Sequence, residues 1–467
     1  MAELTGIYDL DRRNISERLF VSESFDVVER KLRASGQRIS LFYVDGFVKD
    51  AEMLKLIQFV MDEGTVGSAE GLSERLPYVE VGRESRIDAL VLAVLSGQAV
   101  MIAESFGGTA LLIDVRTYPA RTTSEPNTDR VMQGARDGFV ETLVMNTALI
   151  RRRIRDPGLR MRHFSVGDAS KTDVVMCYLD GTADKKLVEN LEKRLKEIKP
   201  KSLTLGYRSL AESLVGTGWW NPFPKVRSTE RPDTAAAQVL EGSILLICDT
   251  TPQVMILPTS IFDYLSQADD YYFPPFTGSY LRLVRIAILI LSTVATPLWY
   301  LYLEYAEVLP STLRFLVPDD PGALPIILQL LLVEIAIDGL KIASMNTPDM
   351  LSNSLSVVGA LILGDFAVGV GWLCPDVILY MAFVAIATFA QQNAELSYAI
   401  KFVRIATLVF VFGFGIFGLL LGGTLFAFLL LENRGLTGKR RYLYPLIPFD
   451  GRALFRLLFR AKKQNYD

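Results

Sequence analysis

The stretch ISLFYVDG, residues 39–46, decides the architecture of the first half of the chain, because it returns as DVVMCYLDG at residues 173–181. Each stretch is an apolar run that ends in Asp-Gly, a pattern typical of a buried strand that enters a turn. An amphipathic helical pattern follows each stretch, over residues 51–61 and 185–198. The repetition predicts two copies of one strand–turn–helix unit.

A second pair of matching segments extends the repeat. Asp88 lies nine residues before Gly97, as Asp233 lies nine residues before Gly242. Two strand patterns follow each glycine: residues 98–104 and 109–115 in the first copy, and residues 243–249 and 253–258 in the second. We therefore expect an α/β soluble region of two tandem related subdomains. The first covers residues 1–127, and the second, with a linking helix, covers residues 128–277.

The linking helix is predicted over residues 139–154, where apolar residues recur at helical spacing before Asp-Pro-Gly at 156–158. Its end carries Arg151, Arg152, Arg153 and Arg155. One interpretation is a solvated helix end whose cations complement the helix dipole. The other is an acidic contact, with a neighbouring subunit or with lipid headgroups. A loop is expected over residues 221–233.

The distribution of charge separates a membrane region from this soluble region. Between Leu281 and Leu431, 16 of 151 residues are charged, against 85 of the other 316. Helices of about 20 apolar residues cross a bilayer. The candidate spans are residues 283–302, 324–343, 355–373, 377–390 and 402–431. We expect an all-α polytopic membrane domain of four to six helical segments over residues 278–432, followed by a basic cytoplasmic tail over residues 433–467.

The number of crossings is left open by these spans. The N-terminus lacks the features of a signal peptide, and the tail after Leu431 has nine Lys/Arg against three Asp/Glu, so both ends are expected in the cytoplasm. Five full crossings conflict with this expectation, because an odd number of crossings would place the two ends of the chain on opposite sides of the membrane. Either the short fourth span is re-entrant, or the glycine-rich fifth span breaks into two segments. An even number of crossings is predicted.

Acidic residues inside apolar segments are candidates for an ion pathway, because a charge at bilayer depth is costly and needs a reason. The candidates are Glu334, Asp338, Asp365 and Glu395. The alternative is structural: Asp338 pairs with Lys341 three residues later, and Glu395 lies at the membrane interface.

Composition argues against several other functions. The net charge of −3 without a basic face disfavours nucleic-acid binding. Cys177, Cys248 and Cys374 are dispersed and His163 is the single histidine, so neither a disulfide framework nor a metal site is expected. Strand-end aspartates such as Asp45 and Asp180 have no nucleophile or base beside them in sequence. No catalytic residue, cofactor or enzymatic activity is predicted.

Several motifs resemble those of the GerA family of bacterial spore germination proteins. They are GARDGFVETL at residues 134–143 with Arg136 and Glu141, the arginines 151–153, RPD at residues 231–233 with Arg231 and Asp233, Gly242, DYY at residues 270–272 and GSYLR at residues 278–282. Residues 334–348 and PDVILYM at residues 375–381 look more like the stage V sporulation AF branch than like the A subunits of nutrient germinant receptors. The chain departs from the family at QQN, residues 391–393, where the family keeps a proline-containing turn.

The resemblance implies an integral protein of the spore inner membrane whose soluble region faces the cytoplasm or spore core. It implies a homo-oligomer of about five subunits that works with a small membrane partner protein and other germination proteins in the lipid bilayer. The expected function is an ion channel or ion-release subunit that amplifies germination. The alternatives are a receptor A subunit or a non-conducting membrane scaffold.

Overall fold

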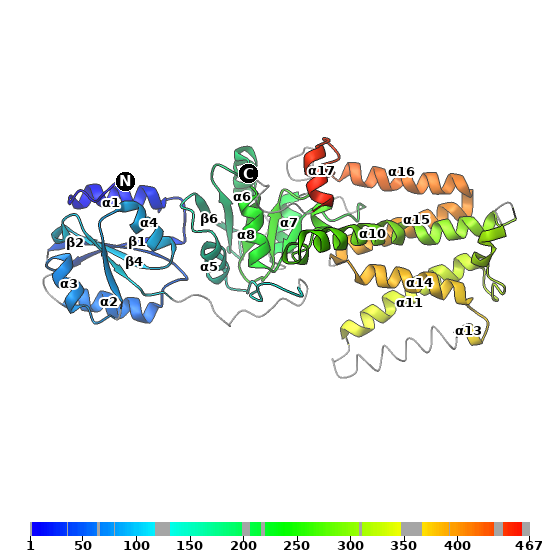
Figure 1. The fold of residues 1–467 in the computed structure, drawn as a ribbon, viewed down its shortest axis with the longest axis horizontal. Coiled ribbons are helices and arrows are strands. Elements are labelled where there is room, and N and C mark those ends of the chain that lie inside the picture. The colour runs from blue at the N-terminus through cyan, green and yellow to red at the C-terminus, as the bar shows by residue number, and fades with distance from the viewer. Residues whose placement is uncertain are drawn as a thin grey trace. The chain divides into compact units, whose positions relative to one another are not determined.

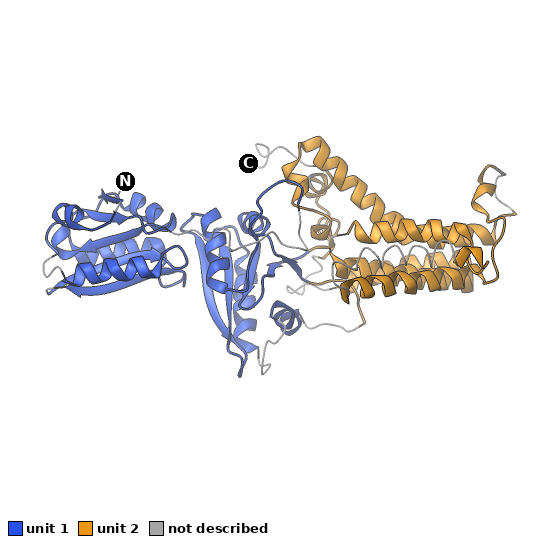
Figure 2. Ribbon diagram, turned by 90° about the horizontal axis from the view of Figure 1, so that it is seen from below, with its two compact units in different colours: residues 1–217, 226–259 blue, residues 218–225, 260–467 orange. Residues whose placement is uncertain are grey.

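The structure, a computed structural model, forms two compact units (Figures 1 and 2). The first comprises residues 1–217 and 226–259, and the second comprises residues 218–225 and 260–467. The long segment of the second unit begins at Ser260, ahead of the membrane boundary expected at residue 278, and residues 218–225 belong to the same unit. The residues described are 2–34, 36–62, 66–78, 80–116, 131–198, 206–215, 220–307, 311–346, 367–391, 393–433 and 442–459.

The first unit begins with a five-stranded antiparallel sheet in the order β1-β2-β4-β5-β3. Its strands are β1 (Val27–Ala34), β2 (Gln37–Val44), β3 (Val81–Glu84), β4 (Ala99–Ala103) and β5 (Ala110–Ile113). Its helices are α1 (Tyr8–Leu19), α2 (Asp50–Asp62), α3 (Ala69–Arg75) and α4 (Ile87–Leu95).

The second subdomain repeats this arrangement, with the strand order β6-β7-β9-β10-β8. Its strands are β6 (Leu159–Val166), β7 (Thr172–Leu179), β8 (Arg227–Thr229), β9 (Ile244–Cys248) and β10 (Val254–Leu257). Its helices are α5 (Leu143–Arg153), α6 (Lys185–Glu197), α7 (Tyr207–Val215) and α8 (Pro232–Leu240). The two orders are identical element by element, which confirms the predicted duplication and the α/β soluble region.

The apolar run that opens the repeat is buried on both faces of its sheet. In β2, Ile39 and Leu41 pack in the core formed with α2 and α3, whereas Phe42 and Val44 pack in the core formed with α1 and α4. Successive strand residues point to opposite faces, so a sheet covered by helices on both sides requires a continuous apolar run.

The linking helix α5 begins at Leu143 rather than at the expected Phe139. The Asn146 side chain accepts a hydrogen bond from the Val140 N–H at 2.8 Å and donates one to the Val140 carbonyl at 2.6 Å. These bonds hold the chain extended up to Thr142. The expected loop at residues 221–233 is also shorter, because it contains β8 and ends where α8 begins at Pro232.

The second unit is helical (Figures 1 and 2). Its helices are α9 (Asp269–Tyr272), α10 (Pro275–Glu304), α11 (Ile326–Asn346), α13 (Ala367–Gly369), α14 (Pro375–Phe389), α15 (Ala394–Phe414), α16 (Ile416–Glu432) and α17 (Gly451–Leu458), with 3₁₀ turns at Ile261–Tyr264 and Ser311–Leu316. The expected span at residues 355–373 lies mostly outside the described residues, so its helical character stays a prediction.

The fifth expected span breaks in two, as one of the two alternatives predicted. Gly415 has a φ of +51°, ends α15 and starts α16, and the two helices then pack against each other. Gly418 and Gly422 permit the approach: a Cβ atom on Gly418 would collide with the Phe410 carbonyl, and one on Gly422 with Thr407. The pair is a helical hairpin stabilised by close glycine contacts.

The start of α10 and the end of α16 lie at the same end of the helical unit. Ile286 and Leu289 of α10 pack in one cluster with Leu396 and Ile400 of α15 and with Leu429 of α16. This end of the bundle is called the foot below. The segment expected as a free tail also returns to the foot, since Tyr442 is buried there and its carbonyl accepts a hydrogen bond from the Ile261 N–H at 2.9 Å.

Candidate functional site

Four charged side chains meet inside the helical unit. Glu334 and Asp338 lie one turn apart on α11, and Lys401 and Arg404 lie one turn apart on the facing helix α15. Residues three or four positions apart share one helix face, so each helix presents a pair of like charges to its neighbour. We call these four residues the charge cluster.

Ion pairs and hydrogen bonds connect all four members of the charge cluster. The Arg404 Nε donates to Glu334 Oε1 at 2.9 Å, and its Nη2 pairs with the same oxygen. The Lys401 Nζ lies 3.2 Å from Glu334 Oε2 and also pairs with the Asp338 carboxylate. Arg404 Nη1 donates to the Ser292 carbonyl of α10 at 3.0 Å. The charge cluster therefore links α10, α11 and α15.

Burial differs sharply within the charge cluster. Glu334, Lys401 and Arg404 are buried, whereas the Asp338 side chain is 33% exposed. Two acids and two bases give no formal net charge, so the pairing offsets much of the desolvation cost of burying them. Asp338 is the member that a solute or a neighbouring chain can reach.

Large apolar side chains are exposed on the helices of the second unit. Ile335 and Ile342 on α11 are largely exposed, as are Leu379 and Ile386 on α14 and Leu420 on α16. Charges that point inward and apolar side chains that point outward are the arrangement that a lipid environment favours. By length and composition, α10 and α15 can each cross a membrane, and α14 and α16 are shorter apolar helices.

The structure places the predicted pathway residues differently. It brings Glu334 and Asp338 together, whereas Glu395 lies in the first turn of α15, before Lys401. Asp365 lies outside the described residues. The alternative pairing of Asp338 with Lys341 is wrong: Asp338 pairs with Lys401, and the Lys341 Nζ lies 4.8 Å from the centre of the Tyr398 ring.

Lys401 and Arg404 were not among the predicted site residues. A signal was present. Arg404 falls inside the predicted span 402–431. Lys401 and Arg404 are three positions apart and Glu334 and Asp338 are four apart, so each pair lies on one helix face, with opposite charge. Two like charges on one face of one apolar segment, and two of opposite sign on one face of another, indicate pairing across helices.

In the soluble region, the motif residues hold the second subdomain together. The buried Arg231 donates to both Asp233 oxygens, at 3.1 and 2.6 Å, and to the Ala135 carbonyl at 3.0 Å. The segment that contains Arg136 and Glu141 is thereby fixed to the start of α8. Gly242 has a φ of +96°, and a Cβ atom there would lie 2.9 Å from the Thr182 carbonyl.

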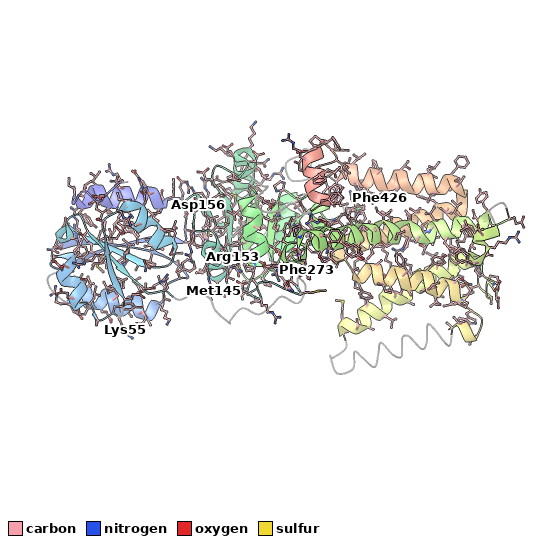
Figure 3. The ribbon with its side chains drawn as sticks, in the orientation of Figure 1. Lys55, Met145, Arg153, Asp156, Phe273 and Phe426 are labelled. Carbon is pink, nitrogen blue, oxygen red and sulfur yellow. The ribbon has the colours of Figure 1, made fainter. Side chains whose placement is uncertain are left out.

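The arginines that end α5 have different environments. Arg151 is buried against Asp26, so neither a solvated end nor a lipid contact describes it. Arg153, labelled in Figure 3, pairs with Asp137 at 2.6 Å, and Arg152 is exposed. For Arg151 and Arg153 the acidic partner belongs to the same chain, not to a neighbouring subunit or to lipid as the alternative predicted.

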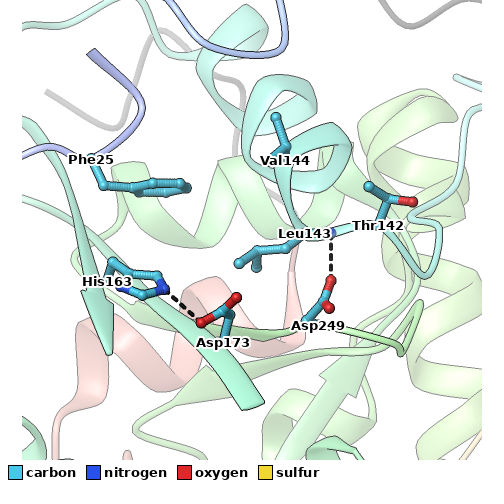
Figure 4. A pocket seen from close by; sticks show the side chains of 7 residues that line it. All are labelled: Phe25, Thr142, Leu143, Val144, His163, Asp173 and Asp249. Atoms are coloured by element: carbon cyan, nitrogen blue, oxygen red, sulfur yellow. Dashed lines mark hydrogen bonds and ion pairs between the residues drawn. The ribbon is translucent and has the colours of Figure 1, made fainter. Parts of the chain in front are cut away.

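A small open pocket of about 330 Å³ lies beside the N-terminus of α5 (Figure 4). His163 Nε2 lies 2.9 Å from Asp173 Oδ1, and the Leu143 N–H donates to Asp249 Oδ1 at 3.0 Å. Burial raises the pKa of the Cys177 thiol, which does not line the pocket, to about 12. No group of three or more His, Cys, Asp or Glu that could hold a metal ion occurs among the described residues.

A duplicated α/β region followed by helices that bury charge and expose apolar side chains defines a membrane-associated protein. The model of the family "Bacillus/Clostridium GerA spore germination protein" matches residues 14–466. The chain belongs to this family of spore germination proteins. It is 39% identical over 451 residues to "Stage V sporulation protein AF" of Bacillus subtilis (strain 168), covering 96% of this chain and 91% of that protein.

Receptor proteins of the family are also similar. "Spore germination protein KA" of Bacillus subtilis (strain 168) is 28% identical over 462 residues, covering 96% of this chain and 84% of that protein. Among solved structures, the N-terminal domain of the A subunit of the Bacillus megaterium spore germinant receptor GerK3 matches with a TM-score of 0.42 and 25% identity. That match covers 55% of this chain and 96% of the other.

Proposed function

We propose that this protein is a multi-pass subunit of an ion-conducting homo-oligomer in the spore inner membrane that amplifies germination. The family gives the germination-related role, and the charge cluster supports the ion-conducting part. A small membrane partner and other germination proteins act with it. The soluble region faces the cytoplasm or spore core.

The partial exposure of Asp338 is the observation that carries the proposal. A carboxylate of this kind at membrane depth costs about 2.5–3.5 kcal/mol on insertion scales, so it persists where it contacts water, an ion or a cation of the protein. Lys401 neutralises Asp338 from one side while a third of its side chain remains open. In an oligomer, α11 would present this open side and its exposed apolar residues to a shared pathway or to the adjacent subunit.

The arrangement at the foot supports an even number of crossings. The start of α10 and the end of α16 pack in one cluster, so the segments before and after the helices lie on one side if the helices span a bilayer. The basic residues after Leu431 favour the cytoplasmic side.

Ion flux through purified protein in liposomes tests the proposal. Asp338→Asn should change the conductance or the cation selectivity, because it removes the exposed charge while keeping the side-chain size. Glu189→Gln is the control, since Glu189 is an exposed carboxylate on α6, outside the helical unit. If the unaltered protein inserts correctly, forms its oligomer and carries no ion, the conducting function is excluded.

A non-conducting scaffold is the second candidate. The pairing of all four members of the charge cluster within one chain favours it, because paired charges bind passing ions weakly. If the protein is a scaffold, it should carry no ion flux but should still bind its partner germination proteins. That binding should be lost when residues 1–259 are removed. A receptor A subunit, the third candidate, predicts that a nutrient changes the behaviour of the complex.

A further inference from the structure

The short helix α17 lies at the foot of the helical unit. The Arg282 Nη1 near the start of α10 donates to the Leu457 carbonyl of α17 at 2.8 Å. Arg282 and Arg285 both pair with the fully buried Asp270, at 3.3 and 3.0 Å. This helix of the basic tail is thereby attached to the start of α10.

One side of α17 is apolar and exposed. Phe455 is 60% exposed and Phe459 is 40% exposed, and their ring centroids are 5.1 Å apart. Phe449, just before the helix, is 74% exposed. Leu457 and Leu458 are half-buried, so α17 packs by one side and presents aromatic rings on another.

Basic charge accompanies these rings. Arg452 is exposed in the first turn of α17, one helical turn before Phe455. The sequence after Leu431 contains nine Lys/Arg and three Asp/Glu. Residues three positions apart share one helix face, so Arg452 lies beside Phe455. Aromatic rings with a basic residue next to them can enter the headgroup region of a bilayer while the cation stays at the lipid phosphates.

The aromatic surface continues onto the start of α10. Phe276 and Tyr280 in its first turns are strongly exposed, as are Tyr271 and Tyr272 of α9. Aromatic residues gather at the level of the lipid headgroups where a helix enters a bilayer. The rings of α17 therefore belong to the same end of the unit as the entry of α10.

We propose that residues 442–459 form an interfacial anchor that binds the surface of an anionic lipid bilayer, with Phe449, Phe455 and Phe459 in the headgroup region and Arg452 on the lipid phosphates. The anchor rests on the proposed insertion of α10 in the membrane. Charge complementarity and continuity with the α10 entry point to lipid as the occupant, rather than to a protein partner or a second copy of the chain. Because Arg282 connects α17 to α10, the lipid contact also fixes the orientation of that helix.

The test uses the full-length protein in nanodiscs of phosphatidylcholine alone, or of phosphatidylcholine and phosphatidylglycerol in equal parts. Cys177, Cys248 and Cys374 are buried, so an environment-sensitive dye reacts selectively with a Phe459→Cys variant. We expect blue-shifted emission and quenching by spin-labelled lipid in the anionic discs, and a weaker response in the neutral discs. Hydrogen exchange of residues 449–459 in the unlabelled protein should slow in the same anionic discs.

Substitutions separate the two parts of the surface. Arg452→Glu should reduce the lipid-bound fraction of the segment roughly fivefold or more in anionic discs, since each basic residue near such a surface contributes about that factor. Phe455→Ser should reduce the lipid-bound fraction of the segment in both the anionic and the neutral discs, because it removes an apolar ring rather than a charge. The control is the double variant Lys185→Glu with Lys186→Glu, on exposed positions of α6. It changes the net charge of the protein but should leave the dye emission and the exchange of residues 449–459 unchanged.

Two results overturn the anchor. One is equal emission and exchange in both lipids for protein that is fully embedded in the discs. The other is protection that appears only in discs holding two copies or an added protein, which assigns the surface to a protein contact. Failure of the protein to enter the discs contradicts the proposed membrane insertion instead, so the two failures are distinct.

Discussion

Arg151 and Asp26 form an ion pair closed to solvent, with Arg151 Nε 2.8 Å from Asp26 Oδ2 and Nη2 3.0 Å from Oδ1. The two residues are 125 positions apart and belong to different copies of the duplicated fold. Arg151 also donates to the Leu159 carbonyl at 3.1 Å, and the neighbouring Phe25 N–H donates to the Met161 carbonyl at 3.0 Å. The pair therefore joins the first subdomain to the edge strand β6 of the second.

Arg151→Ala should destabilise this junction by about 3–5 kcal/mol, because it leaves the Asp26 carboxylate buried without a cation. Arg152→Ala is the control, and on an exposed position it should change stability by about 0.5 kcal/mol or less. Hydrogen exchange of residues 20–34 and 143–166 in the full-length protein measures the effect locally. Equal exchange in the two variants would show that the pair contributes nothing to the junction.

Glu334→Gln should destabilise the helical unit, since it leaves both Lys401 and Arg404 buried with less compensating charge. Removal of one partner of a buried pair costs about 3–5 kcal/mol. A double variant, Glu334→Leu with Arg404→Leu, should lose less stability than the sum of the losses in the single variants Glu334→Leu and Arg404→Leu, because neither charge is then left without its partner. Thermal unfolding in detergent gives the coupling. Strict additivity of the three variants would contradict the pairing.

Gly418→Leu should separate the hairpin of α15 and α16, because a side chain there collides with the Phe410 carbonyl. Gly423 is five positions later on the same helix and has no atom within 4 Å of a Cβ position. Gly423→Leu should therefore fold normally, and the better helix propensity of leucine favours it slightly. Thermal unfolding and the yield of folded protein in detergent compare the two. Similar loss in both variants would show that the close packing is not needed.

The cysteines of the soluble region should resist modification. Burial raises the pKa of both Cys177 and Cys248 to about 12, so the reactive thiolate is scarce at pH 8 and the sulfur is shielded as well. A thiol reagent should label them only when denaturant unfolds the chain. Glu189→Cys, on an exposed position of α6, supplies a fast-reacting reference in the same protein. Rapid labelling of the native cysteines would indicate that the sheet opens.

Much of the fold could be predicted because its pattern is local and repeated. The strand at residues 39–46 and its copy at 173–181 carry the same apolar run and the same turn, and β2 and β7 are found there. The break of the fifth span was predicted as an alternative from its glycines, and Gly415 provides it. Boundaries were less accurate where a side chain overrides the helical pattern, as Asn146 does before α5.

Two of the four members of the charge cluster were singled out from the sequence, and their role as an ion pathway stays a prediction. Glu334 and Asp338 were identified because acidic residues are rare in apolar segments. Their partners on α15 were not identified, since a sequence gives the spacing of residues within a helix but not which helix packs against it. Lys341, nearer in sequence, was the expected partner of Asp338. The packing of α15 beside α11 brings Lys401 closer although it lies 63 positions away.

The sequence alone determined the duplicated soluble region, the apolar helical region and the presence of charges that need compensation, because periodicity, turns and composition act over a few residues. Tertiary structure alone decided which charge meets which, that Arg151 joins the two subdomains, and that α17 returns to the root of α10. Such contacts depend on how whole elements pack, and packing is set by the fit of many side chains at once rather than by any local stretch.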